Sequence, residues 1–163
     1  MTNNIIEIYT DGSSRGNPGP GGYGVVLKFN GAVKEMAKGF RLTTNNRMEL
    51  LAVIEGLRAI KTTQHPIRVY SDSKYVIDAI DKGWLNNWMK TSFKGKKNKD
   101  LWLAYHAIAS KFTINFTWVK GHNGHPENER CDVLAVQAAT GKIVAIDEVF
   151  EATNEQSNSS LDL

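Results

Sequence analysis

Cysteine pairs, long apolar runs and a leader-like start are missing from this sequence. Its only cysteine is Cys131, so no disulfide can form within the chain, and we expect a reducing, cytoplasmic environment. No apolar run approaches the roughly 20 residues that span a bilayer, and Met1–Asn4 has no signal-peptide character. We therefore expect no membrane partner.

Length and composition indicate one globular domain. The chain has 163 residues, of which 41% are hydrophobic and 23% charged, enough to bury a core without disulfides. We place this domain at residues 1–141 and treat 142–163 as a C-terminal extension. The extension ends in a polar stretch, Glu151–Leu163, which we expect to be disordered.

The net charge of +3 names no partner, but the basic residues are unevenly distributed. Lysines cluster between Lys90 and Lys99 without an acid among them, next to Trp84 and Trp88. The cluster is either a nucleic-acid contact or an ordinary solvated loop.

The first half of the chain has the pattern of an antiparallel meander followed by a helix. Ile5–Thr10 is an apolar, β-branched run, and Tyr23–Phe29 and Ala32–Leu42 flank the hairpin signal Asn30-Gly31. After capping residues at 43–46, apolar residues recur at helical spacing to Ile60.

The second half alternates strands and helices. Strands are predicted at Ile67–Ser71 and Thr113–Val119, with Ile114, Phe116 and Trp118 on one face of the latter. Helices are predicted at Ser73–Ile80, Leu101–Lys111 and Pro126–Thr140, the last stopped by Gly141; Ile143–Phe150 is not assigned. This order predicts an α/β fold with a five-stranded mixed sheet flanked by helices.

Carboxylates stand where this topology would bring them together. Asp11 and Asp72 each follow a buried strand, and a right-handed crossover would make these two strands parallel neighbours. Glu49 lies early in the crossover helix, and Asp132 lies one turn into the last helix. The glycine-rich stretch Gly12–Gly24 would let another backbone approach Asp11 closely.

Converging carboxylates repel one another unless cations neutralise them, and oxygen ligands suit Mg²⁺ or Mn²⁺. Two such ions could activate a water and stabilise the leaving oxygen of a phosphodiester. Singly, each acid could equally be a turn residue or a solvated helix-end charge. His122, in a loop between glycines, has a pKa class suited to proton transfer.

Several stretches resemble bacterial type 1 ribonuclease H in one collinear register from Ile5 to Thr140. They are Tyr9–Ser13, Gly16–Gly24, Thr43–Leu50, Ser71–Ser73 and Trp118–Asp132. The resemblance implies the ribonuclease H-like fold for residues 1–141. It also implies hydrolysis of the RNA strand of RNA–DNA hybrids with two Mg²⁺ ions, leaving 5′-phosphate and 3′-hydroxyl ends.

The resemblance also assigns the site residues. The metal-binding acids match Asp11, Glu49, Asp72 and Asp132, and a mobile histidine that assists proton transfer or product release matches His122. The implied substrate-binding residues are Asn17, Thr44, Asn45, Asn46, Arg47, Lys74, Trp84, Asn87, Lys94, Lys96 and Lys97. Among these, Asn17, Asn45 and Asn46 would read the minor groove, while Thr44, Arg47 and Asn87 would grip a DNA-strand phosphate. Ser14 and Lys74 depart from a bacterial relative that has Cys and Gln there.

Two rival functions stay open at this point. One is a DNA-acting nuclease or transposase-like core of the same fold, against which the groove-reading asparagines argue. The other is a catalytically inactive hybrid-binding module, against which the complete acid set argues. The favoured interpretation is a monomer whose partner is an RNA–DNA hybrid duplex, cleaved largely without sequence preference because phosphate contacts carry no base code.

Overall fold

A computed structural model describes residues 4–120, 125–142 and 144–161, with side chains described as far as residue 154. Its centre is a five-stranded sheet in the order β3-β2-β1-β4-β5. The strands are β1 (Ile6–Ser14), β2 (Gly19–Phe29), β3 (Ala32–Thr43), β4 (Ile67–Ser71) and β5 (Ile114–Trp118). The mixed α/β sheet predicted from the sequence is confirmed.

The pairing directions also follow the prediction. β1, β2 and β3 form an antiparallel meander. β4 runs parallel to β1, from Ile6 opposite Ile67 to Tyr9 opposite Tyr70, and β5 runs parallel to β4. The strand that carries Asp11 therefore lies at the centre of the sheet, beside the strand that precedes Asp72.

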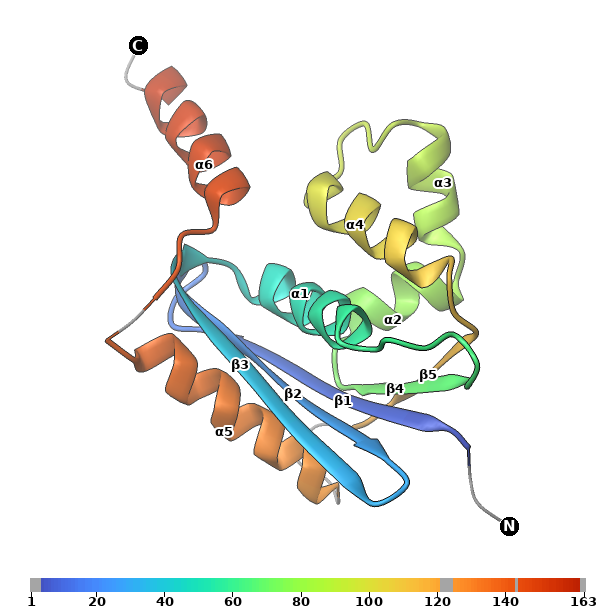
Figure 1. Ribbon diagram of the computed structural model, residues 1–163. Coiled ribbons are helices and arrows are strands. Elements are labelled where there is room, and N and C mark those ends of the chain that lie inside the picture. Colours follow the sequence, from blue (N-terminus) through green and yellow to red (C-terminus); the bar gives the residue numbers. More distant parts are fainter. Residues whose placement is uncertain (1–3, 121–124, 143, 162–163) are drawn as a thin grey trace.

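Helices cover both faces of this sheet (Figure 1). One face carries α1 (Asn45–Arg58), α2 (Lys74–Asp81) and α4 (Lys99–Ala109), with α3 (Trp84–Lys90) beyond them; the other carries α5 (Pro126–Thr140). The main core lies between α1 and the sheet, where Ile8, Val25, Val53 and Leu57 have no exposed surface. Within the described residues, no helix is long and apolar enough to cross a membrane.

One difference from the sequence-based prediction is the end of β1. The parallel pairing with β4 stops at Tyr9, but the antiparallel ladder with β2 continues through Asp11 opposite Gly24 to Ser14 opposite Gly21. Asp11 therefore lies inside a strand and past the end of the parallel pairing, rather than in a turn. A paired strand fixes its backbone more firmly than a turn would.

The glycines of β2 bring α5 close to the sheet. A Cβ atom at Gly24 would lie 2.3 Å from the carbonyl oxygen of Cys131, and one at Gly22 would lie 2.5 Å from that of Ala135. Only glycine leaves room for a helix backbone at this distance. The close approach expected from the glycine-rich stretch is therefore made by a helix of the same chain.

The sequence pattern predicts disorder for Glu151–Leu163, whereas among the described residues the extension contains a helix. This helix, α6 (Glu148–Leu161), projects away from the sheet beyond the end of β3 (Figure 1). Its start is held because Arg41 N–H donates to the carbonyl of Ala145 at 2.9 Å and Arg41 pairs with Glu151 at 2.8 Å. These contacts are made across the fold, so local composition does not reveal them. The boundary at residue 141 stays a prediction.

Candidate active site

Three of the predicted acids meet at the sheet. Asp11 comes from β1, Glu49 from the beginning of α1 and Asp72 from the turn after β4, and each offers a carboxylate oxygen within 4.8 Å of the others. The cause is topological, because α1 is the crossover that makes β4 the parallel neighbour of β1.

Glu49 is fixed from both its own helix and the neighbouring strand. α1 begins at a cap in which the side chain of Thr44 accepts the N–H of Arg47 at 3.3 Å. The backbone N–H of Gly12 donates both to Glu49 Oε1 at 2.6 Å and to Asp11 Oδ1 at 2.9 Å. One amide group therefore sets the relative position of two carboxylates.

Burial makes these acids hard to ionise. Asp11 is 8% exposed and Glu49 is 4% exposed. Burial, with the charges of Asp72 and Asp132 adding to it, raises the pKa of Asp11 to about 7. Burial and then the charge of Asp11 hold the pKa of Glu49 well above its ordinary value. Ionising the whole cluster near neutral pH thus requires positive charge from a ligand.

The donor set fits a divalent metal ion. Glu49 Oε2 is buried and has no hydrogen-bond partner among the described residues. A buried carboxylate oxygen without a donor is costly unless something outside the chain satisfies it. The ligand atoms are carboxylate oxygens, which hard cations prefer. The cluster thus supports the use of a divalent cation but does not select one.

The other two predicted catalytic residues stand differently. Asp132, half-buried on α5, lies outside the group within 4.8 Å, although its charge contributes to the raised pKa of Asp11. His122 lies outside the described residues. Cys131, next to Asp132, is fully buried, and its thiol donates to the carbonyl of Tyr9 at 3.2 Å. That thiol therefore belongs to the packing between α5 and the sheet.

A groove of about 760 Å³ gathers six of the predicted substrate-binding residues. They are Asn17, Thr44, Asn46, Arg47, Lys96 and Lys97. Asn17 reaches α1 directly, because its Oδ1 accepts the N–H of Asn45 at 3.2 Å. Residues of α6 also line the groove, namely Val149, Phe150, Thr153 and Asn154. The extension thus borders the predicted substrate surface.

The resemblance implies that Arg47 grips a DNA-strand phosphate; the structure places it at the groove with Thr44, where its guanidinium group is already paired with two carboxylates. It is 3% exposed, and its guanidinium group binds Asp147 at 2.7 Å and Asp100 at 2.7 Å. These two carboxylates raise its pKa further above an already high ordinary value. The guanidinium therefore joins α1, α4 and the start of α6. Asp100 and Asp147 are distant from Arg47 in the sequence, so local sequence patterns did not predict these ion pairs.

The remaining predicted contacts are on the surface of the helices. Lys74, Asn87 and Lys94 are exposed, as is Trp84, at 40%. Trp88 is half-buried instead and packs against Trp102, with ring centroids 5.8 Å apart. Trp84 is therefore open to solvent, and its contact with substrate stays a prediction.

Sequence reasoning missed one side chain at the site. It grouped Trp118 with the half-buried Ile114 and Phe116, but Trp118 is 42% exposed and its indole N–H faces the carbonyl of Asp72 at 3.4 Å. The one available signal was its place as the last strand residue before the loop that contains His122.

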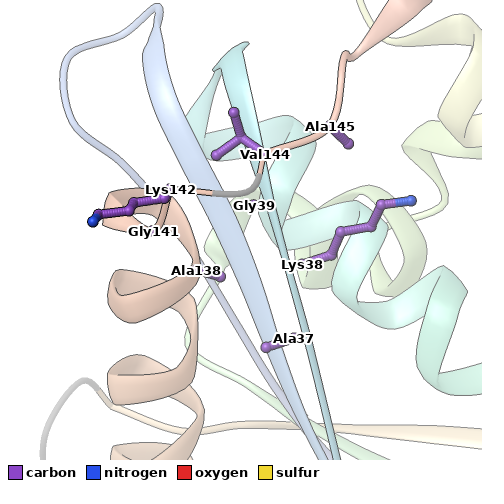
Figure 2. Close-up of a pocket in the computed structure, with 8 residues that line it drawn as sticks. All are labelled: Ala37, Lys38, Gly39, Ala138, Gly141, Lys142, Val144 and Ala145. Carbon is purple, nitrogen blue, oxygen red and sulfur yellow. The ribbon is translucent and has the colours of Figure 1, made fainter.

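A second pocket, of about 620 Å³, lies between β3 and the end of α5 (Figure 2). Small residues line it, together with Lys38 and Lys142, and none of the predicted site residues reaches it. The acid cluster is therefore the better candidate for the chemistry.

Comparisons with known proteins identify the family. The profile of the RNase H family matches residues 3–140. The chain is 52% identical to a ribonuclease H of Desulforamulus reducens over 139 residues, which is 82% of this chain and 87% of the relative. It is 49% identical to a ribonuclease H of Rippkaea orientalis over 151 residues, 90% of this chain and 92% of the relative.

Solved structures give the same result. LC9-RNase H1, described as a type 1 RNase H with the type 2 active-site motif, superposes with a TM-score of 0.76 at 31% identity, over 88% of this chain and 75% of that chain. LC11-RNase H1, solved in complex with an RNA/DNA hybrid, superposes with a TM-score of 0.64 at 28% identity, over 82% of this chain and 96% of that one.

Proposed function

Because the chain belongs to the RNase H family, we propose that its acid cluster hydrolyses the RNA strand of RNA–DNA hybrids with divalent cations bound. The observation that carries the proposal is the meeting of Asp11, Glu49 and Asp72 around an unsatisfied buried oxygen. A binding module would gain nothing from such a cluster, since bare carboxylates repel phosphates. The rival of an inactive hybrid-binding module is accordingly not favoured.

We propose two Mg²⁺ ions, replaceable by Mn²⁺, held by Asp11, Glu49, Asp72 and Asp132. When bound, such ions lower the pKa of a water nucleophile and neutralise charge on the scissile phosphate. Asp11 stands on the central strand, and the charges of both Asp72 and Asp132 act on its carboxylate. Asp132, on the helix that covers the opposite face of the sheet, would be the fourth carboxylate ligand.

The protein's own part in the reaction is to hold these groups and move one proton. Water adds to phosphorus, the bond to the 3′-oxygen breaks, and that oxygen must receive a proton to leave as a 3′-hydroxyl. We assign the supply of that proton to His122, whose ordinary pKa allows it to carry one near neutral pH. The phosphate stays on the 5′ end of the other product.

To select a hybrid, the protein must recognise the RNA strand and the DNA strand separately. The wide minor groove of an A-like duplex exposes the 2′-hydroxyl groups that distinguish RNA from DNA. The exposed amides of Asn17, Asn45 and Asn46 can both donate to and accept from such groups without demanding one base. Thr44, Asn87 and the Trp84 ring would contact the DNA strand. That a relative was solved with an RNA/DNA hybrid supports this substrate.

One experiment tests the proposal directly. Matched RNA–DNA, RNA–RNA and DNA–DNA duplexes are incubated with the protein, with and without Mg²⁺. We expect cleavage of the RNA strand in the hybrid alone, and only with the metal. Cleavage of duplex DNA would favour a transposase-like core, and binding of the hybrid without cleavage would favour an inactive module. Sedimentation of the protein at working concentration checks the expected monomer.

A further inference from the structure

Trp118 ends the strand that runs beside the metal-ligand turn. It is the last residue of β5 and lies opposite Ser71, the residue before Asp72. The next residue, Val119, donates its N–H to the carbonyl of Ser71 at 2.9 Å. The backbone under the indole is therefore tied to the backbone that carries Asp72.

The indole makes two contacts at the site, with different chemistry. Its Nε1–H points to the carbonyl oxygen of Asp72, 3.4 Å away. Its ring face lies under the ammonium group of Lys74, with Nζ 4.1 Å from the ring centroid. That separation is well inside the roughly 6 Å over which a cation is attracted to an aromatic face.

The position of Lys74 is not explained by the stability of its helix. Lys74 is the first residue of α2, where the helix dipole disfavours a positive charge, and α2 has no acid in its first turn. The start of α2 is capped without it, because Ser73 accepts the N–H of Val76 at 3.3 Å. A charge in an unfavourable place beside a catalytic cluster is typical of a functional residue.

We infer that Trp118 is a positioning residue that holds the ammonium group of Lys74 against the RNA-strand phosphate next to the metal site. An aromatic face suits this task because it restrains a flexible lysine without neutralising it, whereas a carboxylate partner would cancel its charge. The inference rests on the proposed function, since it names a group that acts on that substrate.

The test is a double-mutant cycle on hybrid cleavage with Trp118→Leu, Lys74→Met and the double variant. We expect each single variant to raise KM about two- to five-fold, the factor that one exposed cation–π or phosphate contact represents. Lys74→Met should also lower the slope of log KM against log salt by about one. In the Lys74→Met background, Trp118→Leu should leave KM unchanged, because the lysine it positions is gone.

Trp118→Phe distinguishes positioning from a merely structural role. Phenylalanine keeps a ring face and loses the N–H, so it should restore KM to near the wild-type value. The matched control is Lys38→Met, which removes a lysine 5.6 Å from the Phe40 ring on the opposite edge of the sheet and should leave KM unaltered.

Two results would overturn the inference. The first is that the double variant raises KM by the product of the factors measured for Trp118→Leu and Lys74→Met, which would show that the two residues act independently. The other is a Trp118→Leu variant that melts earlier but keeps the wild-type KM and salt slope. In both cases wild-type protein would still cleave hybrids, so the proposed function would stand. An Asp11→Asn variant as active as wild type would instead defeat the proposed function.

Discussion

Gly12 and Glu49 are in direct contact: the Gly12 N–H donates to the Glu49 carboxylate at 2.6 Å. A Cβ atom at Gly12 would lie 2.3 Å from the Glu49 backbone nitrogen and 2.5 Å from the Met48 carbonyl carbon. The strand that carries Asp11 and the helix that carries Glu49 therefore pack at a distance that only glycine allows. The acid cluster depends on this contact.

Gly12→Ala should accordingly reduce both stability and activity. Forcing α1 away from β1 is overpacking, which costs about 1–3 kcal/mol in the free energy of unfolding. Urea unfolding and hybrid cleavage measure the two effects. Gly141→Ala is the control, because an added Cβ atom there would lie 3.4 Å from the carbonyl oxygen of Gln137 and 3.6 Å from that of Ala138. A Gly12→Ala variant with wild-type stability would show that α1 moves at no cost.

Asp11→Asn and Asp72→Asn should each lower the cleavage rate by about a thousand-fold or more. Both remove a charged oxygen ligand, and bound metal ions supply several kcal/mol of transition-state stabilisation. The fold should persist, since Asn is close in size to Asp. Single-turnover rates at saturating Mg²⁺, with circular dichroism as the fold control, check this. Retained activity in either variant would contradict metal binding by the cluster.

The titration of Asp11 predicts how metal-free protein responds to pH. Its folded pKa of about 7 lies above the ordinary value of 3.8, so the folded state holds this proton more tightly than the unfolded state. Its contribution to stability is therefore complete below about pH 4 and is lost as pH rises through about 7. Melting temperatures in EDTA, compared with Asp11→Asn, isolate the effect from the remaining carboxylates.

The same pKa sets the pH dependence of metal binding. Protons compete with the cation for Asp11 and Glu49, so affinity for Mn²⁺ should rise as pH increases from 6 to 8. Calorimetric titration at several pH values measures it. A pH-independent affinity would mean that the cation does not bind ionised Asp11.

Arg47→Met should destabilise the protein by about 3–5 kcal/mol, the usual cost of breaking a buried ion pair by removing one partner. Asp147 and Asp100 would be left facing each other without their cation. Urea unfolding measures the loss, and Arg58→Met, at an exposed pair with Glu55, is the control. If stability were unchanged and hybrid binding weaker, Arg47 would be a phosphate-binding residue and not a structural one.

Replacing Lys94, Lys96 and Lys97 with Gln should raise KM and reduce the salt dependence of binding. Each lysine that contacts a phosphate releases counterions, so the slope of log affinity against log salt should fall by about one per contact. Lys34→Gln, on β3, serves as a control for loss of charge alone. An unchanged slope would show that the loop is simply solvated.

The sequence by itself determined the order of the five strands and of helices α1, α2, α4 and α5. Period-two runs, the Asn30-Gly31 hairpin and the change to helical spacing after Thr43 are local signals, and the right-handed crossover rule converts them into neighbouring parallel strands. That rule placed Asp11 beside Asp72 and drew Glu49 toward them. The structure agrees because backbone chirality leaves few alternative connections.

Only the tertiary structure decided what depends on partners distant in the chain. Three features join residues that are many tens of positions apart in the chain. They are the ion pairs of Arg47 with Asp100 and Asp147, helix α6 with its contacts, and the β2 glycines that pack against α5. Trp118 is the clearest case. Strand periodicity predicted that its side chain lies on the same face as Ile114 and Phe116, but in the structure it is exposed at the end of β5, next to Asp72. Local patterns determine which element a residue joins, but packing between elements decides what its side chain contacts.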